Sequence, residues 1–169
     1  MKKVSFLFIA VFTILSFSYS QVTSIIGKWK PVKCEIEGFL IADAKTKKSE
    51  FVKPIEELVK GDKNQTQSTQ MLEMMKSMLL EKMQTTTEEY QANGNYFEYN
   101  STGKGNPEPQ KYTYDSKLKV ITLVNKETSE NEKISVEYTK TGFIGTVEMT
   151  SFIDPAKKMK LKMTYEKAY

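Results

Sequence analysis

The side chains of this chain that can do chemistry are carboxylates, tyrosines and lysines. Its 169 residues include 25 basic side chains, all of them lysine, with one cysteine and no histidine. Nucleophilic catalysis through a histidine base is therefore excluded, as are histidine-ligated metals and multi-cysteine zinc sites. A single cysteine allows no internal disulfide, and arginine forks for phosphate or carboxylate are missing. This composition favours binding over catalysis.

The remaining candidates for a general base are carboxylates around one predicted hairpin. Glu88 and Glu89 are adjacent, so in a strand they point to opposite faces and cannot act as a pair. Glu98 follows a predicted turn at Asn93-Gly94, and its side chain points into the fold only if that turn has three residues rather than two. One carboxylate is not a catalytic constellation, and calcium loops of the D-x-D-x-D-G type are absent. We therefore expect no enzymatic activity, no cofactor and no metal, and we interpret Cys34 as a small buried hydrophobe.

Residues 1–20 have the pattern of a cleaved signal peptide. Two lysines precede an almost unbroken apolar run from Val4 to Phe17, and serines follow it before an expected cleavage ahead of Gln21. The run is shorter than the ~20 apolar residues of a spanning helix. We expect a periplasmic or extracellular protein without a membrane span, whose mature domain covers 21–169 as a monomer. Its nearly balanced charges argue against nucleic-acid binding.

The segment between Gly38 and Gln84 is predicted to be partly helical. Residues 43–53 are polar and lysine-rich, which predicts a loop. Residues 54–61 begin with proline and acids and end with lysine and glycine, as short helices do. We expect Ser68 to cap a second helix that runs to Gln84. Its apolar residues recur at helical spacing, which predicts one broad apolar face.

Alternation of apolar and polar residues predicts eight strands. The first contains Val32, Cys34 and Ile36, and the others cover 85–90, 96–100, 111–114, 118–124, 133–138, 143–149 and 159–165. Consecutive antiparallel strands with one apolar face bury that face by closing into a barrel. The expected fold is mainly β: an eight-stranded antiparallel up-and-down barrel, with one or two helices inserted between strands 1 and 2, at about 54–84. Such a barrel is filled by side chains or holds one small ligand.

Several short motifs resemble a known family. Gly27-Lys28-Trp29 is similar to the G-x-W that opens lipocalins. The segment from Tyr90 to Tyr96, which contains Asn93-Gly94, resembles a hairpin of the lipocalin-like domains that Bacteroidetes export. The hairpin at 110–123 and the meander at 134–165 fit the same order. The resemblance implies a barrel of the calycin group, with Gly27 and Trp29 as its closing anchor.

Two departures from that resemblance concern the ligand and the closed end. The helical insertion is similar in position to the helical portal of fatty-acid-binding proteins, which clamp a carboxylate with arginine and tyrosine. This chain has no arginine, so that clamp cannot be carried over. Lipocalins also often stack an arginine on the tryptophan, and here a lysine such as Lys162 or Lys167 would take its place.

The first hypothesis for function is a carrier of a small apolar or amphipathic molecule in the barrel cavity. Alternation assigns these lining residues: Tyr90, Tyr96, Phe97, Tyr112, Tyr114, Val136, Tyr138, Phe143, Val147 and Met163. The length of the loop at Asn93-Gly94 decides which residues of the second strand point into the barrel, and the sequence allows two lengths. A two-residue loop places Tyr90 and Phe97 on one face, whereas a three-residue loop pairs Tyr90 with Tyr96. The alternative to a cavity is that these aromatic rings fill the barrel.

The second helix allows two interpretations. Met71, Met75, Met78 and Leu79 would form an adaptable lid over the barrel mouth, or they would be ordinary core between helix and barrel. The second hypothesis for function is a solid barrel that acts as a protein-interaction or surface module. Its contact would be the methionine face or the lysines at 157–162, although such lysines usually form a solvated strand face.

Overall fold

The computed structural model describes residues 22–61, 63–101, 108–124, 131–151 and 156–169. The predicted signal peptide, residues 1–20, lies outside the described residues. Within those ranges, we find no helix with the length and apolar character needed to cross a membrane.

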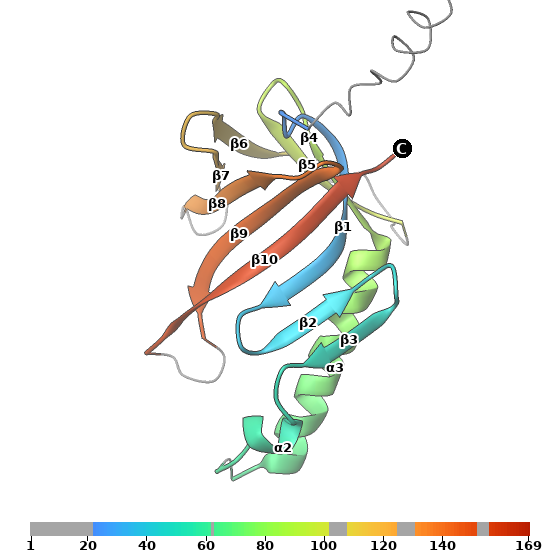
Figure 1. Cartoon of the computed structure of the whole chain (residues 1–169), viewed down its shortest axis with the longest axis vertical. Helices are drawn as coiled ribbons and strands as arrows, with labels where there is room; N and C mark the ends of the chain where they lie inside the picture. Colours follow the sequence, from blue (N-terminus) through green and yellow to red (C-terminus); the bar gives the residue numbers. More distant parts are fainter. Residues whose placement is uncertain (1–21, 62, 102–107, 125–130, 152–155) are drawn as a thin grey trace, which may run out of the picture.

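The described residues form ten strands and two helices, which Figure 1 labels. The strands are β1 (Gly27–Ile36), β2 (Leu40–Asp43), β3 (Lys48–Phe51), β4 (Thr86–Tyr90), β5 (Asn95–Asn100), β6 (Gln110–Asp115), β7 (Val120–Val124), β8 (Asn131–Tyr138), β9 (Gly142–Thr150) and β10 (Lys158–Lys167). The helices are α2 (Ile55–Leu58) and α3 (Gln65–Thr85). The eight strands expected from sequence correspond to β1 and β4–β10.

Those eight strands form a closed antiparallel barrel, so the predicted fold class is confirmed. From β4 to β10 each strand pairs with the next along the chain, and β1 pairs with both β4 and β10 to close the ring. The alternation that predicted the strands matches their burial. In β10, for example, Lys158, Lys160 and Lys162 are exposed, while Met159 is buried and Leu161 half-buried. The lysines therefore lie on the outer face of the barrel.

The segment after β1 differs from the sequence-based expectation. Residues 43–53 were expected to form a loop, but β2 and β3 form a hairpin there, so the helices follow the third strand of the chain. β1 is long enough to serve two neighbours on one edge: its first residues, 27–29, pair with β4, and residues 33–36 pair with β2. Burial alternates along both strands, but in β3 the inner position next to Lys48 and Glu50 is Ser49, so the sequence shows little alternation of apolar and polar residues.

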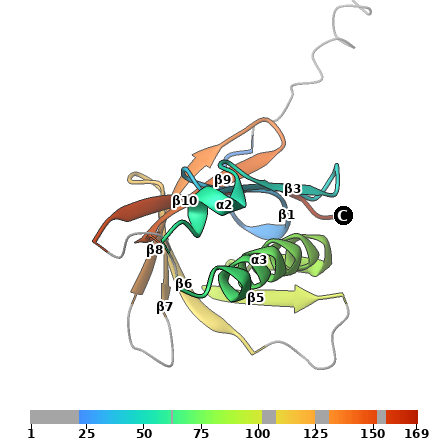
Figure 2. The ribbon, with the colours of Figure 1, turned by 90° about the horizontal axis from the view of Figure 1, so that it is seen from below.

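Helix α3 covers the end of the barrel where β4 and β2 separate from each other along β1. It contacts β1, β2 and β3, and Figure 2 shows it between that side of the sheet and β5. The helix begins four residues earlier than predicted, with Asn64 as its N-cap. Ser68, expected to be the cap, lies inside the first turns, and its backbone N–H donates to the Asn64 carbonyl at 3.0 Å.

Two apolar cores meet at the middle of the barrel. The first fills the interior around Trp29, Tyr90 and Phe143, and the second joins β1, β2 and β10 to α3 around Cys34, Leu40 and Met83. Met163 packs against both. Cys34 is fully buried, as predicted, and burial raises the pKa of its thiol to about 11. It therefore remains a protonated apolar filler.

Candidate functional site

A cavity of about 300 Å³ lies inside the barrel at the end covered by α3. Its wall is built from barrel strands and from the last turns of α3, and its lining is mostly apolar. The lining residues are Pro31, Leu79, Lys82, Met83, Thr86, Glu88, Tyr90, Tyr96, Leu123, Glu132, Ile134, Gly145, Val147, Leu161, Met163 and Tyr165. This volume lies at the lower end of the range of ~300–1,000 Å³ found for small-molecule sites.

Strand β4 presents three polar side chains to this cavity. Thr86, Glu88 and Tyr90 alternate with Thr87 and Glu89, so the first three share the inner face and are all buried. The Oγ1 atom of Thr86 has no hydrogen-bond partner in the described part of the chain, although the residue is 1% exposed. A buried hydroxyl of this kind is a polar contact left open at the cavity wall.

The turn at Asn93-Gly94 decides which face of β5 points inward. Gln91 N–H donates to the Asn95 carbonyl at 2.9 Å, so the loop has three residues and Tyr90 pairs with Tyr96. Gly94 adopts φ +79, a left-handed conformation that glycine accommodates without strain. Of the two loop lengths that the sequence allows, the three-residue loop is therefore the one formed.

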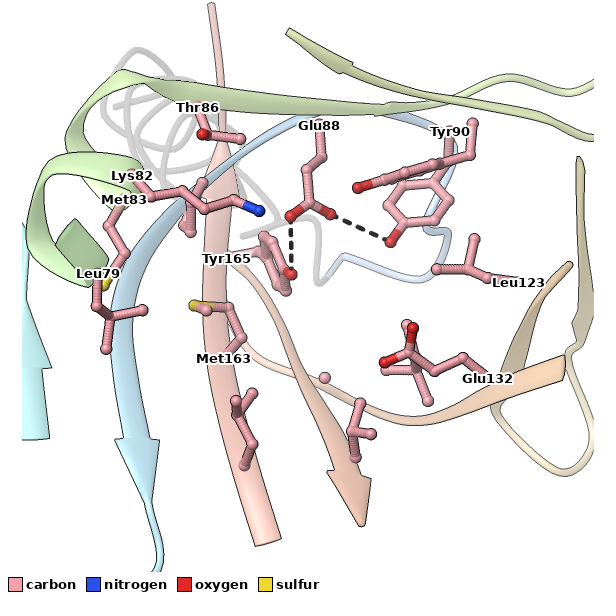
Figure 3. Close-up of a pocket in the computed structure, with 16 residues that line it drawn as sticks. Leu79, Lys82, Met83, Thr86, Glu88, Tyr90, Leu123, Glu132, Met163 and Tyr165 are labelled. Carbon is pink, nitrogen blue, oxygen red and sulfur yellow. Dashed lines mark hydrogen bonds between the residues drawn. The ribbon is translucent and has the colours of Figure 1, made fainter. Parts of the chain in front are cut away.

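Glu88 is the buried carboxylate of this site. Tyr165 OH donates to its Oε1 at 3.0 Å, and Tyr90 OH donates to its Oε2 at 3.3 Å (Figure 3). Burial raises the pKa of Glu88 from its ordinary value near 4.5 to about 7, against the lowering effect of hydrogen bonds from Tyr165, Tyr90 and Tyr96. The carboxyl group therefore changes its protonation close to neutral pH. The group can bind or release a proton, or accept a hydrogen bond.

Aromatic packing behind Glu88 holds its phenol donors in place. The Tyr165 ring stacks on Phe143 with centroids 4.7 Å apart, and Phe143 meets the edge of Trp29 at 5.0 Å. On the other side, Tyr90 contacts Tyr96 at 5.0 Å and Tyr112 at 5.2 Å. These rings are buried and mutually packed, so the hydroxyl groups they carry are preorganised around the carboxylate.

Charged groups at the outer part of the lining are mostly acidic. Lys82 and Glu132 are exposed residues of the lining, and Lys82 Nζ lies 3.2 Å from Glu98 Oε1. Glu98 points to the same side as Glu88, its partner across the β4–β5 pair. The site therefore brings three carboxyl groups and one ammonium group together, and the ammonium group already has a carboxylate partner.

The structure places the ten predicted lining residues in three groups. Tyr90, Tyr96, Val147 and Met163 line the cavity. Tyr112, Val136 and Phe143 are instead buried in the first core, with Tyr114 and Tyr138 packed against it and their hydroxyl oxygens 2.8 Å apart. Phe97 is on the outer face, stacked on Tyr99 at 6.0 Å, because the three-residue loop turns it outward. Aromatic side chains therefore fill one end of the barrel, and the other end contains the cavity. Each of the two alternatives considered from the sequence describes one end.

The four predicted lid residues separate in the same way. Leu79 lines the cavity, and Met75 packs in the second core. Met71 and Met78 face solvent, with 68% and 61% of their surface exposed. The predicted broad apolar face is therefore narrower than expected, and its packed stripe consists of Leu72, Met75, Leu79 and Met83.

The predicted closing anchor lies at the opposite end of the barrel. Trp29 is fully buried, and its Nε1 donates to the Ile25 carbonyl at 2.5 Å. Lys167 Nζ lies 4.3 Å from the centre of the Trp29 ring, so Lys167, of the two lysines proposed from the sequence, provides the cation. Gly27 has φ +130, and a Cβ atom there would lie 2.9 Å from Lys167 Nζ. The positive φ is the stronger reason for glycine here, because the flexible end of Lys167 could move away from a Cβ atom.

The most polar part of the site was not predicted from the sequence. Glu88 was considered only against its neighbour Glu89, although its spacing of two from Tyr90 places it on the same inner face. That spacing was a usable signal for both Glu88 and Thr86. Met83 belongs to an apolar set at helical spacing with Leu72, Met75 and Leu79, and it enters the lining because α3 ends directly at β4.

Within the described residues, no group of three or more cysteine, histidine or acidic side chains is arranged to hold a metal ion. Comparison of the chain with protein-family models, with curated proteins and with solved structures gave no match.

Proposed function

We propose that this chain is an exported, non-enzymatic binding protein of the lipocalin-like type, which holds one small apolar or amphipathic molecule in its barrel cavity. The observation that carries the proposal is the cavity of about 300 Å³, with an aliphatic wall and a buried cluster of Glu88 and tyrosine hydroxyls. Ligand sites commonly combine a concave apolar surface with a few convergent polar groups. A lone carboxylate with phenol donors supports binding better than it supports catalysis.

The lipocalin-like assignment rests on the closed end of the barrel. Trp29 stands at the start of the first strand, its ring is covered by a cation from the last strand, and Gly27 leaves room for that lysine. The ring of eight strands in chain order is the architecture that the resemblance implied.

A titration with a neutral fluorescent probe, N-phenyl-1-naphthylamine, tests the proposal. We expect a saturable rise in probe emission with one site per chain. The Val147→Phe variant, which adds volume at a lining residue, should abolish the rise. The matched control is Glu148→Phe, because Glu148 is the next residue of β9 and is exposed. A wild-type protein that shows no saturable binding, or equal binding by the two variants, would contradict a carrier that uses this cavity.

Export is tested separately on the chain expressed with its first 20 residues. Two lysines, an apolar run and terminal serines support cleavage before Gln21. Intact-mass measurement of the protein recovered from the periplasm or medium should give the mass of 21–169. Recovery of only the full-length chain from the cytoplasm would exclude export by this signal.

A second candidate function is a protein-interaction module, supported by one observation. Met71, Met74 and Met78 lie on one side of α3 and expose 68%, 64% and 61% of their surface. Exposed methionines at helical spacing are adaptable contacts for a partner. This candidate predicts that replacing all three with serine removes a partner captured from the native host, whereas Val147→Phe leaves it bound.

A further inference from the structure

The charge inside the cavity identifies the ligand class more narrowly than its shape does. Glu88 is 8% exposed and makes no ion pair with any described residue; its hydrogen-bond partners are phenols. Buried carboxylates are usually paired with a cation, because hydrogen bonds alone do not compensate for the loss of hydration. Lys82, the cation of the lining, is paired with Glu98 and its side chain is 60% exposed. Among the described residues no cation neutralises Glu88, which leaves this role to a ligand or to a proton.

The geometry around Glu88 leaves room for one more donor. A carboxylate has about four lone-pair positions. Tyr165 and Tyr90 use two of them at distances of 3.0 and 3.3 Å, and Tyr96 is a third phenol donor. Thr86 supplies an independent observation: its Oγ1 atom is buried, lines the same cavity and has no partner within the described ranges. An ammonium group carries three donors, so it can bind the carboxylate and the threonine oxygen together.

The rest of the cavity suits an apolar body attached to that head group. Val147, Leu161 and Met163 form its wall on β9 and β10, and Leu79 and Met83 close it from α3. The tyrosine rings beside Glu88 are also favourable neighbours for a cation. A ligand carboxylate would instead be repelled by Glu88, Glu98 and Glu132.

We propose that the cavity binds a small amphipathic amine, whose ammonium group pairs with Glu88 and whose apolar part lies against the β9, β10 and α3 wall. The inference rests on the proposed carrier function and names its ligand class. It distinguishes this site from a fatty-carboxylate site, since the lining provides an anion where such a site provides a cation.

Calorimetric titration with three ligands of equal chain length tests the inference: octylammonium, octanol and octanoate. At about pH 8.5 we expect octylammonium to bind at least about tenfold more tightly than octanol, and octanoate most weakly. In Glu88→Gln, octylammonium should lose about thirtyfold in affinity while octanol keeps its own. The matched control is Glu132→Gln, which removes an exposed carboxylate of the same lining and should change affinity by less than about fivefold.

The pH dependence of the affinity for octylammonium distinguishes a Glu88 that pairs with the ligand from a Glu88 that only supports the fold. Titratable and charged groups from several elements lie around Glu88. The tyrosines are Tyr90 on β4, Tyr96 on β5 and Tyr165 on β10. The charged groups are Glu98 on β5, Glu132 on β8 and Lys82 on α3. The pKa of Glu88 is about 7, so acid below that pH neutralises the carboxylate that pairs with the ammonium group. Affinity for octylammonium should therefore fall about tenfold per pH unit below about pH 7 in the wild type, and should stay constant in Glu88→Gln.

The outcomes separate the inference from the function on which it rests. Tighter binding of octanol or octanoate than of octylammonium would overturn the amine and leave a carrier of another ligand. Equal loss in Glu88→Gln and Glu132→Gln would also overturn it, because pairing at Glu88 would then not be specific. Absence of binding by all three ligands and by the neutral probe would overturn the carrier function itself.

Discussion

The two ends of the barrel interior are built from different kinds of side chain. At the closed end, the rings of Trp29 and Phe143 meet edge to face, and Tyr112 and Ile121 belong to the same buried core, so the interior is filled. At the end covered by α3, aliphatic and thioether side chains, together with Glu88 and three tyrosines, surround a cavity of about 300 Å³. Side chains therefore fill the interior at one end and leave space at the other.

Tyr165 belongs to both ends, and this shows how the two are coupled. Its ring stacks on Phe143 in the filled core, while its hydroxyl donates to Glu88 at the cavity. The rigid half of the barrel therefore fixes a polar group that the hollow half uses. A cavity that is soft on the α3 side can accommodate a ligand without moving the carboxylate that binds it.

Truncation of a side chain should cost much more at the filled end than at the hollow end. Trp29→Ala removes a fully buried indole, and we expect a loss of about 3–5 kcal/mol in the free energy of unfolding. Met163→Ala removes a half-buried side chain that already borders empty space, and should cost less than about 2 kcal/mol. Urea unfolding followed by circular dichroism measures both, since Trp29 fluorescence is lost in one variant. Equal losses would show that the two ends do not differ in packing.

Glu88 should make the stability of the ligand-free protein fall as the pH rises. Its pKa is near 4.5 when exposed and about 7 in the folded chain, so between these values the folded state binds more protons than the unfolded state. The contribution of this group is therefore fully present below about pH 4.5, declines up to about pH 7 and is constant above. The total decline is up to about 3 kcal/mol.

The control for this titration is Glu88→Gln, which keeps the shape but carries no charge. Urea unfolding across this range should show the decline in the wild type, and the difference between the two proteins isolates Glu88. Asp43 titrates in the opposite sense, because backbone hydrogen bonds from Thr46 lower its pKa, but it does so in both proteins. A constant difference between wild type and variant would mean that Glu88 is not desolvated.

The barrel could be predicted from sequence because its strands repeat one simple pattern. In β4 every second residue is buried, and in β10 buried or half-buried residues alternate with exposed lysines from Lys158 to Lys162. This period of two is visible without coordinates. The site could be predicted only in part. Tyr90 and Val147 have the same inward phase as Tyr112 and Phe143, and alternation gives the face of a residue but not its height along the barrel axis. Whether an inward ring lines space or fills it depends on which strands pair at that level.

Register and long-range packing explain the other differences. The β2–β3 hairpin was missed because Lys48 and Glu50 are exposed on an edge strand, so its sequence has the composition of a loop. Phe97 was assigned inward under one turn length and lies outside under the other, a change of one residue in the loop. The face of α3 that packs is selected by the position of β2 and β3, which helical spacing alone does not contain.

Helix α3 has one exposed face and one packed face. Truncating a methionine should change the free energy of unfolding least on the exposed face. Replacing Met71 and Met78 with alanine removes side chains that are 68% and 61% exposed, so each change should alter the free energy of unfolding by no more than about 0.5 kcal/mol. Met83→Ala on the same helix is the control, because Met83 is 1% exposed and its loss should cost about 2–5 kcal/mol.

The same variants, compared in the probe titration, distinguish a lid from a core helix, since Met83 borders the cavity and the outer methionines are not among its lining residues. A change in probe release by Met71→Ala or Met78→Ala, with stability unaltered, would restore the lid interpretation and would place a moving segment over the cavity.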